Sequence, residues 1–254
     1  MRNFLLATII AGALAACVTT TTTRTENKGS TDDAAEINYQ LGAQYLRQGN
    51  LRLARERLER SIEQNPNLPG SHIALALVHE QTGNIDRANA AYRRALKVAP
   101  KNPNALNSYA VFLCKQRRYE EGQRYFLRAA ELPDNLAPEV AYTNAGVCAL
   151  ETPDPVAAEQ HFRTALVRNP EFADALLQMA ALSLSRDDAL RARAFVARFE
   201  SAHKMTPESL LLAVRVEQAG GDRPAMRRYA DRLRRDYPDS REAQSLGNII
   251  NNDG

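Results

Sequence analysis

Few side chains in this 254-residue chain could do chemistry, and the three cysteines and four histidines are the first to consider. His72 and His79 are seven residues apart, so on a helix they would share one face, where they could bind a metal or fill a core. His161 and His203 have no cysteine or carboxylate at ligand spacing, and no phosphate-binding loop, G-x-S-x-G or HExxH motif occurs. We therefore predict no catalytic residue, no metal site and no small-molecule substrate.

The first cysteine, Cys17, closes an N-terminal segment with a specific order of residues. Arg2 gives a positive start, residues 4–13 are apolar, and Leu-Ala-Ala-Cys follows at 14–17. The apolar run has the length of a secretory signal and is short for a membrane-spanning helix. The last four residues resemble the bacterial lipobox, in which small residues flank the cleavage site and the cysteine thiol takes a diacylglyceryl group. An ordinary signal peptide with a chance cysteine is the alternative.

The lipobox resemblance implies that residues 1–16 are removed and that Cys17 carries two or three acyl chains, a covalent lipid in place of any other cofactor. One chain anchors only marginally, whereas two give a stable anchor. Val18 lacks the Asp that retains enterobacterial lipoproteins in the inner membrane, so we expect an outer-membrane protein that faces the periplasm. Residues 18–34 are polar and rich in threonine. With Cys17 they form a predicted flexible tether, 17–34, that spans roughly 23 Å.

The rest of the chain is periodic, because small residues recur every 34 residues with one interval of 36. One series is Gly42, Ala76, Ala110, Gly146, Ala180 and Val214, and another is Ala54, Ala88, Gly122, Ala158, Ala192 and Met226. Prolines recur in step with them, at Pro66, Pro100, Pro170 and Pro238. Small residues at positions 8 and 20 and proline at 32 resemble the tetratricopeptide repeat. Six repeats fit, at 35–68, 69–102, 103–138, 139–172, 173–206 and 207–240, followed by a tail at 241–254.

Each repeat is expected to form two antiparallel helices, so we predict an all-α fold, a right-handed superhelical solenoid. Small residues at positions 8 and 20 let the two backbones approach. Gly49 and Gly83 suit the left-handed end of a first helix, and proline stops the second. His72 and His79 fall at positions that this repeat packs with aromatic residues, so core filling is the favoured interpretation.

Cys114 and Cys148 lie at position 12 and position 10 of the first helices of repeats three and four. At 100° per residue these positions are on opposite flanks of their helices, so the two side chains could face each other across neighbouring repeats. Disulfides form in the periplasm. We therefore favour a Cys114–Cys148 disulfide over two independent small core residues.

A partner is expected on the stripe formed by positions 2, 5, 9 and 12 of each first helix, which lines the concave groove in this family of folds. The predicted groove residues are Tyr39, Ala43, Leu46, Ile73, Leu77, Glu80, Asn104, Asn107 and Val111. The N-terminal end of this groove is apolar, which suits an apolar helix or an extended segment. A clamp for a C-terminal carboxylate is disfavoured because Gln40 and Ala74 stand where lysine or asparagine would be needed. The alternative is that neighbouring helices cover these side chains.

Two stretches carry a more specific resemblance. NSYAVFLC at 107–114 and NAGVC at 144–148 resemble the paired N-x-Y-G-x-F-L-C and N-A-G-x-C signatures of type IV pilus biogenesis and stability lipoproteins, also called pilotins. The chain departs from them at Ser108 and Ala110, where the family more often has Asn and Gly. The resemblance implies a protein that binds secretin subunits of the type IV pilus and promotes their localisation and multimerisation in the outer membrane.

A second function remains open, that of a structural periplasmic lipoprotein that recruits cell-wall or envelope enzymes. An enzyme is disfavoured by the absence of catalytic motifs. The net charge of +3, with no aromatic residues alternating with basic ones, gives no indication of nucleic-acid binding.

Overall fold

The computed structural model of the protein describes residues 28–152 and 155–250, which form thirteen α-helices and no strand. The first six are α1 (Lys28–Arg47), α2 (Leu51–Gln64), α3 (Pro69–Gln81), α4 (Ile85–Val98), α5 (Pro103–Lys115) and α6 (Tyr119–Ala130). The others are α7 (Pro138–Leu150), α8 (Pro155–Arg168), α9 (Ala173–Leu184), α10 (Ala189–Ala202), α11 (Pro207–Ala219), α12 (Arg223–Asp236) and α13 (Arg241–Ile250). The signal segment and Cys17 lie outside the described residues.

The turn inside repeats one, two, three, five and six uses a left-handed residue, as predicted for Gly49 and Gly83. Gly49 and Gly83 have φ of +73°, and Gly221 in repeat six has φ of +72°. Arg117 and Asp187 hold the equivalent turns of repeats three and five at φ of 59°, where a side chain is strained. Helix starts follow familiar rules, with Asn50, Asn102, Asp188 and Asp222 accepting capping hydrogen bonds and proline opening α3, α5, α7 and α11.

The residues at positions 8 and 20, which are Gly or Ala in five helix pairs and Val214 and Met226 in the sixth, are buried in all six pairs, so the predicted repeat register is confirmed. Two positions show why the side chains must be small. A Cβ atom on Gly42 would lie 2.6 Å from Leu58 Cγ, and one on Gly146 would collide with the Phe162 ring. The two helices of a repeat therefore touch at these points, and their packing excludes any larger residue.

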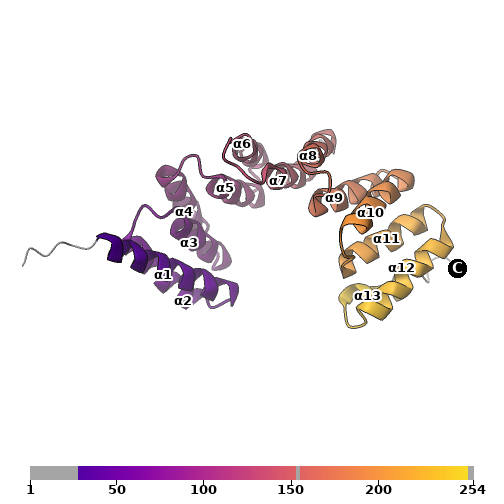
Figure 1. The fold of residues 1–254 in the computed structure, drawn as a ribbon, viewed down its shortest axis with the longest axis horizontal. Coiled ribbons are helices and arrows are strands. Elements are labelled where there is room, and N and C mark those ends of the chain that lie inside the picture. Colours follow the sequence, from indigo (N-terminus) through magenta and orange to yellow (C-terminus); the bar gives the residue numbers. More distant parts are fainter. Residues whose placement is uncertain (1–27, 153–154, 251–254) are drawn as a thin grey trace, which may run out of the picture.

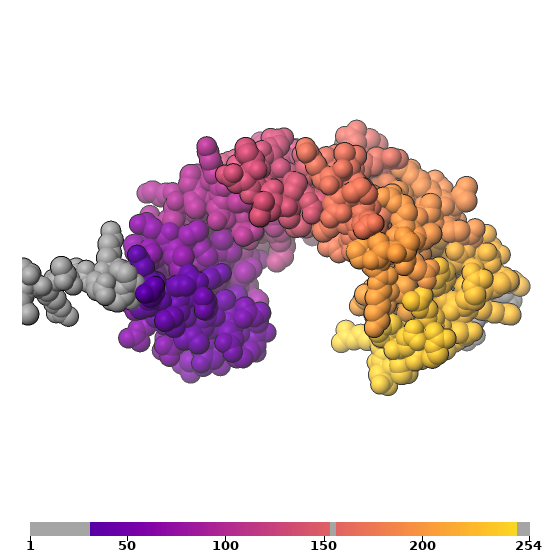
Figure 2. All heavy atoms as spheres, in the orientation of Figure 1, coloured from indigo at the N-terminus to yellow at the C-terminus, as the bar shows by residue number. Residues whose placement is uncertain are grey.

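The helix pairs stack into an open arch (Figure 1). Each odd-numbered helix from α1 to α11 contacts the next odd-numbered one, whereas in the described chain the even-numbered helices make no close backbone contact with each other. The odd-numbered helices therefore line the inner, concave side and the even-numbered helices fan out on the convex side. Figure 2 shows the resulting hollow between the N-terminal and C-terminal repeats.

One domain boundary differs from the prediction, and the predicted tail contains a helix. Helix α1 begins at Lys28, so residues 28–34 extend the first helix instead of the tether. A contact distant in sequence supports this extension, since Asn65 Nδ2 donates to Asp32 Oδ1 at 3.0 Å. The segment 241–254 contains α13, whose fully buried Leu246 covers the last repeat. A solenoid end exposes apolar surface, and α13 provides the cap that repeat six requires. None of the described helices combines the length and apolar character needed to cross a bilayer.

Candidate protein-binding groove

The N-terminal part of the concave side contains a pocket of about 330 Å³ between α1, α3 and the start of α5. Its lining residues are Tyr39, Ala43, Leu46, Arg47, Gly70, Ile73, Ala74, Leu77, Asn102 and Asn104. Six of the nine predicted groove residues are among them, and all six remain at least partly accessible to solvent. The neighbouring helices therefore leave room for a ligand side chain here, with apolar walls and an asparagine amide at one end.

The shape of this pocket depends on Tyr39 and Gly70. A Cβ atom on Gly70 would lie 2.9 Å from Tyr39 Cζ, so the glycine gives the tyrosine ring the space to lie against α3. Tyr39 and Leu46 also pack against the buried cluster of Ala54, Leu58, Ala74 and Val78. The apolar floor is thus continuous with the core of the first two repeats, which makes it a rigid surface.

Glu80 does not share this pocket. Its carboxylate accepts hydrogen bonds from the Tyr92 hydroxyl and from Lys115 Nζ, the latter at 3.2 Å. Burial and the adjacent Glu80 raise the pKa of Tyr92, so the phenol stays protonated and keeps donating. Glu80 therefore links α3, α4 and α5, and its carboxylate is engaged within the protein.

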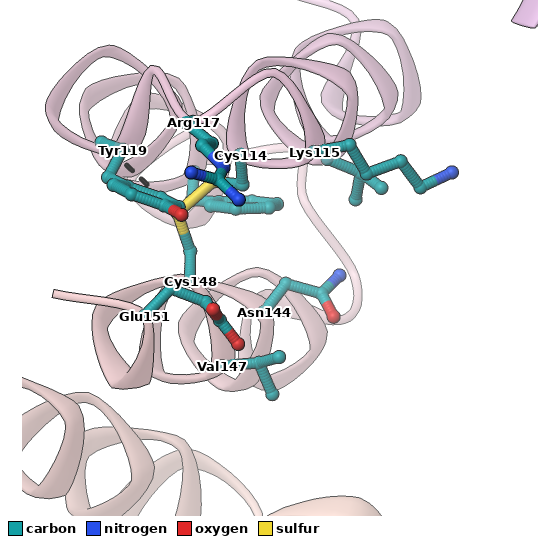
Figure 3. A pocket seen from close by; sticks show the side chains of 10 residues that line it. Cys114, Lys115, Arg117, Tyr119, Asn144, Val147, Cys148 and Glu151 are labelled. Atoms are coloured by element: carbon teal, nitrogen blue, oxygen red, sulfur yellow. Dashed lines mark hydrogen bonds between the residues drawn. A yellow bond between two sulfur atoms is a disulfide. The ribbon is translucent and has the colours of Figure 1, made fainter.

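A second pocket, of about 430 Å³, lies further along the concave side between α5 and α7 (Figure 3). Its lining residues are Val111, Cys114, Lys115, Arg117, Tyr119, Phe126, Asn144, Val147, Cys148 and Glu151. Of the predicted residues only Val111 and the two cysteines are here. Asn107 lies beside it, where its Oδ1 accepts from Asn144 Nδ2 at 3.0 Å. The pocket therefore combines valine walls with amide and charged groups at its rim.

The two cysteine sulfurs lie at bonding distance in the second pocket, and their Cα atoms are 5.8 Å apart. Figure 3 shows the bridge between the two helices with Tyr119 beside it. Cys148 Sγ lies 3.7 Å from the Tyr119 carbonyl oxygen. A Cβ atom on Gly122 would collide with Cys114 Sγ, which explains why repeat three has glycine where most repeats have alanine. The position of Cys114 thus depends on a residue of α6 as well as on α7.

The histidine side chains serve packing. His72 and His79 are buried, as predicted, and His72 Nε2 lies 2.8 Å from the Pro66 carbonyl oxygen. Burial lowers the pKa of both rings, so they are neutral at pH 7. Throughout the described residues, no three His, Cys, Asp or Glu side chains gather as they would around a metal ion.

Comparison with known proteins places this geometry in a family. Tetratricopeptide-repeat patterns match residues 36–68, 73–137 and 114–173. The type IV pilus assembly protein PilF of Pseudomonas aeruginosa PAO1 is 32% identical over 217 residues, which cover 85% of each chain. The chain belongs to the PilF/PilW family of type IV pilus biogenesis factors. A solved structure of P. aeruginosa PilF has a TM-score of 0.69 at 31% identity and covers 87% of this chain and 99% of its own.

Membership of the PilF/PilW family is supported by a second structure. PilW, described as a widely conserved type IV pilus biogenesis factor, has a TM-score of 0.72 at 25% identity, with 84% of this chain and 97% of PilW covered. The family supports a role in type IV pilus biogenesis through contacts with other proteins. Tetratricopeptide-repeat proteins of this family are assembly factors, and the chain is not an enzyme.

The sequence prediction missed most of the second pocket of this PilF/PilW-type solenoid. The predicted stripe stopped in repeat three, yet position 9 of repeat four is Val147, which is 40% exposed. The same stripe holds Val140 and Leu150, 37% and 38% exposed. Carrying the positional rule one repeat further would have found these three residues. Arg117 and Tyr119 had no such signal, because Arg117 enters the pocket from the turn between α5 and α6 and Tyr119 from the first residue of α6.

Proposed function

We propose that this protein is an outer-membrane lipoprotein, a pilotin, that binds secretin subunits of the type IV pilus and promotes their localisation and multimerisation. The observation that carries the proposal is the open, apolar pocket between α1 and α3 in a chain of the PilF/PilW family. Assembly factors need a surface that holds a subunit and then releases it. A pocket with one or two apolar anchor sites and an amide at its end suits such a contact.

The bound secretin segment is expected to insert an apolar side chain between Tyr39 and Ile73. Leu46 and Leu77 line the same pocket and would complete its apolar contact. Asn104, at the end of the pocket, has an amide that can both donate to and accept from a peptide backbone. An extended segment or one turn of helix would satisfy both features, and the concave hollow beyond gives room for the rest of the subunit.

The proposed anchor is the acylated Cys17, eleven residues before the start of α1 at Lys28. Eleven residues of polar coil have a root-mean-square span of about 18 Å. The N-terminal pocket would thus be held within a short distance of the lipid surface, where a secretin subunit must insert. Replacing Cys17 with Ala should prevent acylation and leave the protein soluble or as an uncleaved precursor. A processed Cys17→Ala protein that still fractionates with the outer membrane would contradict the lipoprotein assignment.

Site-specific photocrosslinking in cells tests the partner. A benzoylphenylalanine at position 39 keeps an aromatic ring in the pocket, and the same residue at position 60 of α2 provides a control on the convex side. We expect a secretin adduct from position 39 and none from position 60. Equal adducts from both positions, or a cell-wall enzyme as the main adduct from position 39, would overturn the proposal.

A further inference from the structure

The positive charge of the chain is concentrated on one part of the molecule. Residues 87–128 contain ten Lys and Arg but only two Glu, a net charge of +8, whereas the whole chain has +3. The rest of the protein is therefore acidic overall. Helix α4 contributes four of these cations, which are Arg87, Arg93, Arg94 and Lys97.

The four cations of α4 share its outer face. At 100° per residue they fall within an arc of about 120°, opposite the buried Ala88, Tyr92 and Ala95. All four are exposed, and among the described ion pairs none includes them. Asp86, in the first turn, is the only carboxylate of the helix. Charge repulsion between these side chains is left uncompensated, which disfavours the isolated protein and is relieved by an external anion.

Other convex helices pair some of their cations with carboxylates of the same helix. On α2, Arg52 and Arg55 pair with Glu56 and Glu59. On α12, Asp231 and Asp236 pair with three of the arginines, Arg232, Arg234 and Arg235. Arg223, Arg227 and Arg228 of α12 appear in none of the described ion pairs, so α4 differs from α2 and α12 only in that none of its four cations has a described ion pair.

The cationic face continues onto α6. Tyr109 of α5 lies between the two helices, since its hydroxyl donates to Asn89 Oδ1 of α4 at 3.0 Å and its ring lies 5.0 Å from that of Tyr125 of α6. Arg128 sits over the Tyr125 ring at 5.1 Å, and both Arg124 and Arg128 are exposed. The α4 and α6 cations thus form one basic strip on the convex side of repeats two and three.

We propose that this basic strip, Arg87, Arg93, Arg94, Lys97, Arg124 and Arg128, docks on the surface of a bilayer that contains anionic phospholipid. Protein partners are held by buried aromatic or aliphatic anchors. Among the described side chains, Ile85 at the start of α4 is the only large apolar one that this helix exposes, and Ala90 occupies the middle of its outer face. A convex surface of exposed cations without anchors suits a lipid surface, where each Lys or Arg is attracted by headgroup phosphates.

The chain outside the structure is compatible with this placement. Lys28 is eleven residues after Cys17, and a flexible linker of that length would span about 18 Å, which would let the arch turn its convex side toward the membrane. In that orientation the concave pockets face away from the lipid and stay accessible to a partner. This orientation rests on the proposed lipid anchor at Cys17, whereas the vesicle experiment uses protein without that anchor, so failure of one proposal is distinguishable from failure of the other.

Vesicle cosedimentation tests the strip on the protein from residue 18 onward, which keeps every described helix and therefore the whole described core. Vesicles of phosphatidylcholine with about one-third phosphatidylglycerol should bind the protein at about 50 mM salt, and binding should weaken strongly at about 300 mM. Vesicles of phosphatidylcholine alone should bind at least tenfold less. Equal binding to both vesicles, or binding that salt does not weaken, would overturn the proposal without recourse to any variant.

Variants then locate the contact. The fourfold variant Arg87→Gln, Arg93→Gln, Arg94→Gln, Lys97→Gln should lower the partition coefficient at least tenfold. A matched control, Arg223→Gln, Arg227→Gln, Arg228→Gln, Arg241→Gln, removes the same charge from exposed sites at the C-terminal end and should bind nearly as wild type. A third variant, Arg87→Lys, Arg93→Lys, Arg94→Lys, keeps the charge and should also bind. Equal loss in the two glutamine variants, loss in the lysine variant, or preference for an acidic polypeptide over the vesicles would contradict the proposal.

Discussion

The two halves of the solenoid join their repeats by different physical means. Between repeats two and three the contact is aromatic, with the Tyr92 and Phe112 rings 5.2 Å apart, and between repeats three and four it is the Cys114–Cys148 bridge. In the C-terminal half, carboxylates reach across helices to arginines. Glu159 of α8 accepts from Arg186 and Arg191 in the next repeat, and Glu217 of α11, only 4% exposed, accepts from Arg193 of α10.

The N-terminal half thus has aromatic and covalent junctions beside the Glu80–Lys115 pair, whereas the C-terminal half has more ion pairs between repeats. Aromatic and covalent contacts carry no charge, so the walls of the N-terminal pocket at Tyr39, Ile73 and Leu77 can stay apolar and open to a partner. Both pockets of the candidate groove lie in α1 to α7. Ionic junctions depend on pH and salt, so the two halves should respond differently to the same change of solution conditions.

Loss of the Cys114–Cys148 bridge should lower the free energy of unfolding more than any other change considered. It closes a loop of 34 residues in sequence separation, for which chain entropy gives about 3–4 kcal/mol of the free energy of unfolding. Urea unfolding of a Cys114→Ser, Cys148→Ser variant should show that loss, concentrated in the N-terminal half. Thiol labelling of the unreduced, unfolded protein is the control. Two reactive thiols in protein purified from the periplasm would rule the bond out in the cell.

Removal of the Glu159 carboxylate should cause the second largest loss in the free energy of unfolding. Hydrogen bonds from Arg191, and then from Arg163 and Arg186, lower the pKa of Glu159 to about 2. A depressed pKa stabilises the fold above the carboxyl's ordinary pKa near 4.5, and that stability is lost as the pH falls from about 4.5 toward 2. We expect Glu159→Gln to lower the free energy of unfolding by about 1–2 kcal/mol at pH 7.

The pH dependence distinguishes this effect from a general packing defect. The difference in the free energy of unfolding between wild type and Glu159→Gln should shrink as the pH falls from about 4.5 toward 2. Glu56→Gln removes an exposed pair with Arg52, at 3.7 Å, and should cost less than about 0.5 kcal/mol. A Glu159 variant that matches the Glu56 variant at every pH would show that the C-terminal junction does not depend on these charges.

Much of the fold and of the N-terminal pocket could be predicted from the sequence, whereas the two ends of the solenoid could not. The six helix pairs, the small contact residues and most of the N-terminal pocket follow from the period of 34, because each repeat uses equivalent positions in the same way. The bounds of the two terminal helices do not follow from the period. Helices α1 and α13 have a neighbouring repeat on one side only, and the length of α1 depends on contacts such as the hydrogen bond between Asn65 and Asp32.

The second pocket and the ionic junctions depend on contacts between repeats. The rim residue Arg117 stands at the turn position that glycine holds in repeats one and two, and the period does not show that its side chain would enter the pocket. Glu159 is 32 residues from Arg191 in sequence, and only the stacking angle between α8 and α10 brings them together. A period identifies equivalent residues, but it does not give the rotation between one repeat and the next.

Substitution of a left-handed turn residue should change the free energy of unfolding least. Arg117 has φ of 59° at the position where Gly83 of repeat two has +73°. Arg117→Gly should raise the free energy of unfolding by about 0.5–1 kcal/mol through relief of strain, and Gly83→Arg should lower it by about 1 kcal/mol. Thermal denaturation of the two variants checks the sign. A fall in melting temperature for Arg117→Gly would mean that the arginine contributes more to the second pocket than its conformation costs.

The central claim is that the N-terminal concave pocket holds the pilus partner, and a single substitution tests it most directly. Ala43 lines this pocket without belonging to a buried cluster, so Ala43→Arg fills the pocket and leaves the core intact. Ala197, exposed on α10, allows the same substitution and the same charge change on the convex side. The measurement is the amount of secretin multimer in outer membranes of cells that carry each variant. The account predicts severe loss with Ala43→Arg and a normal level with Ala197→Arg, and normal multimers with Ala43→Arg would contradict it.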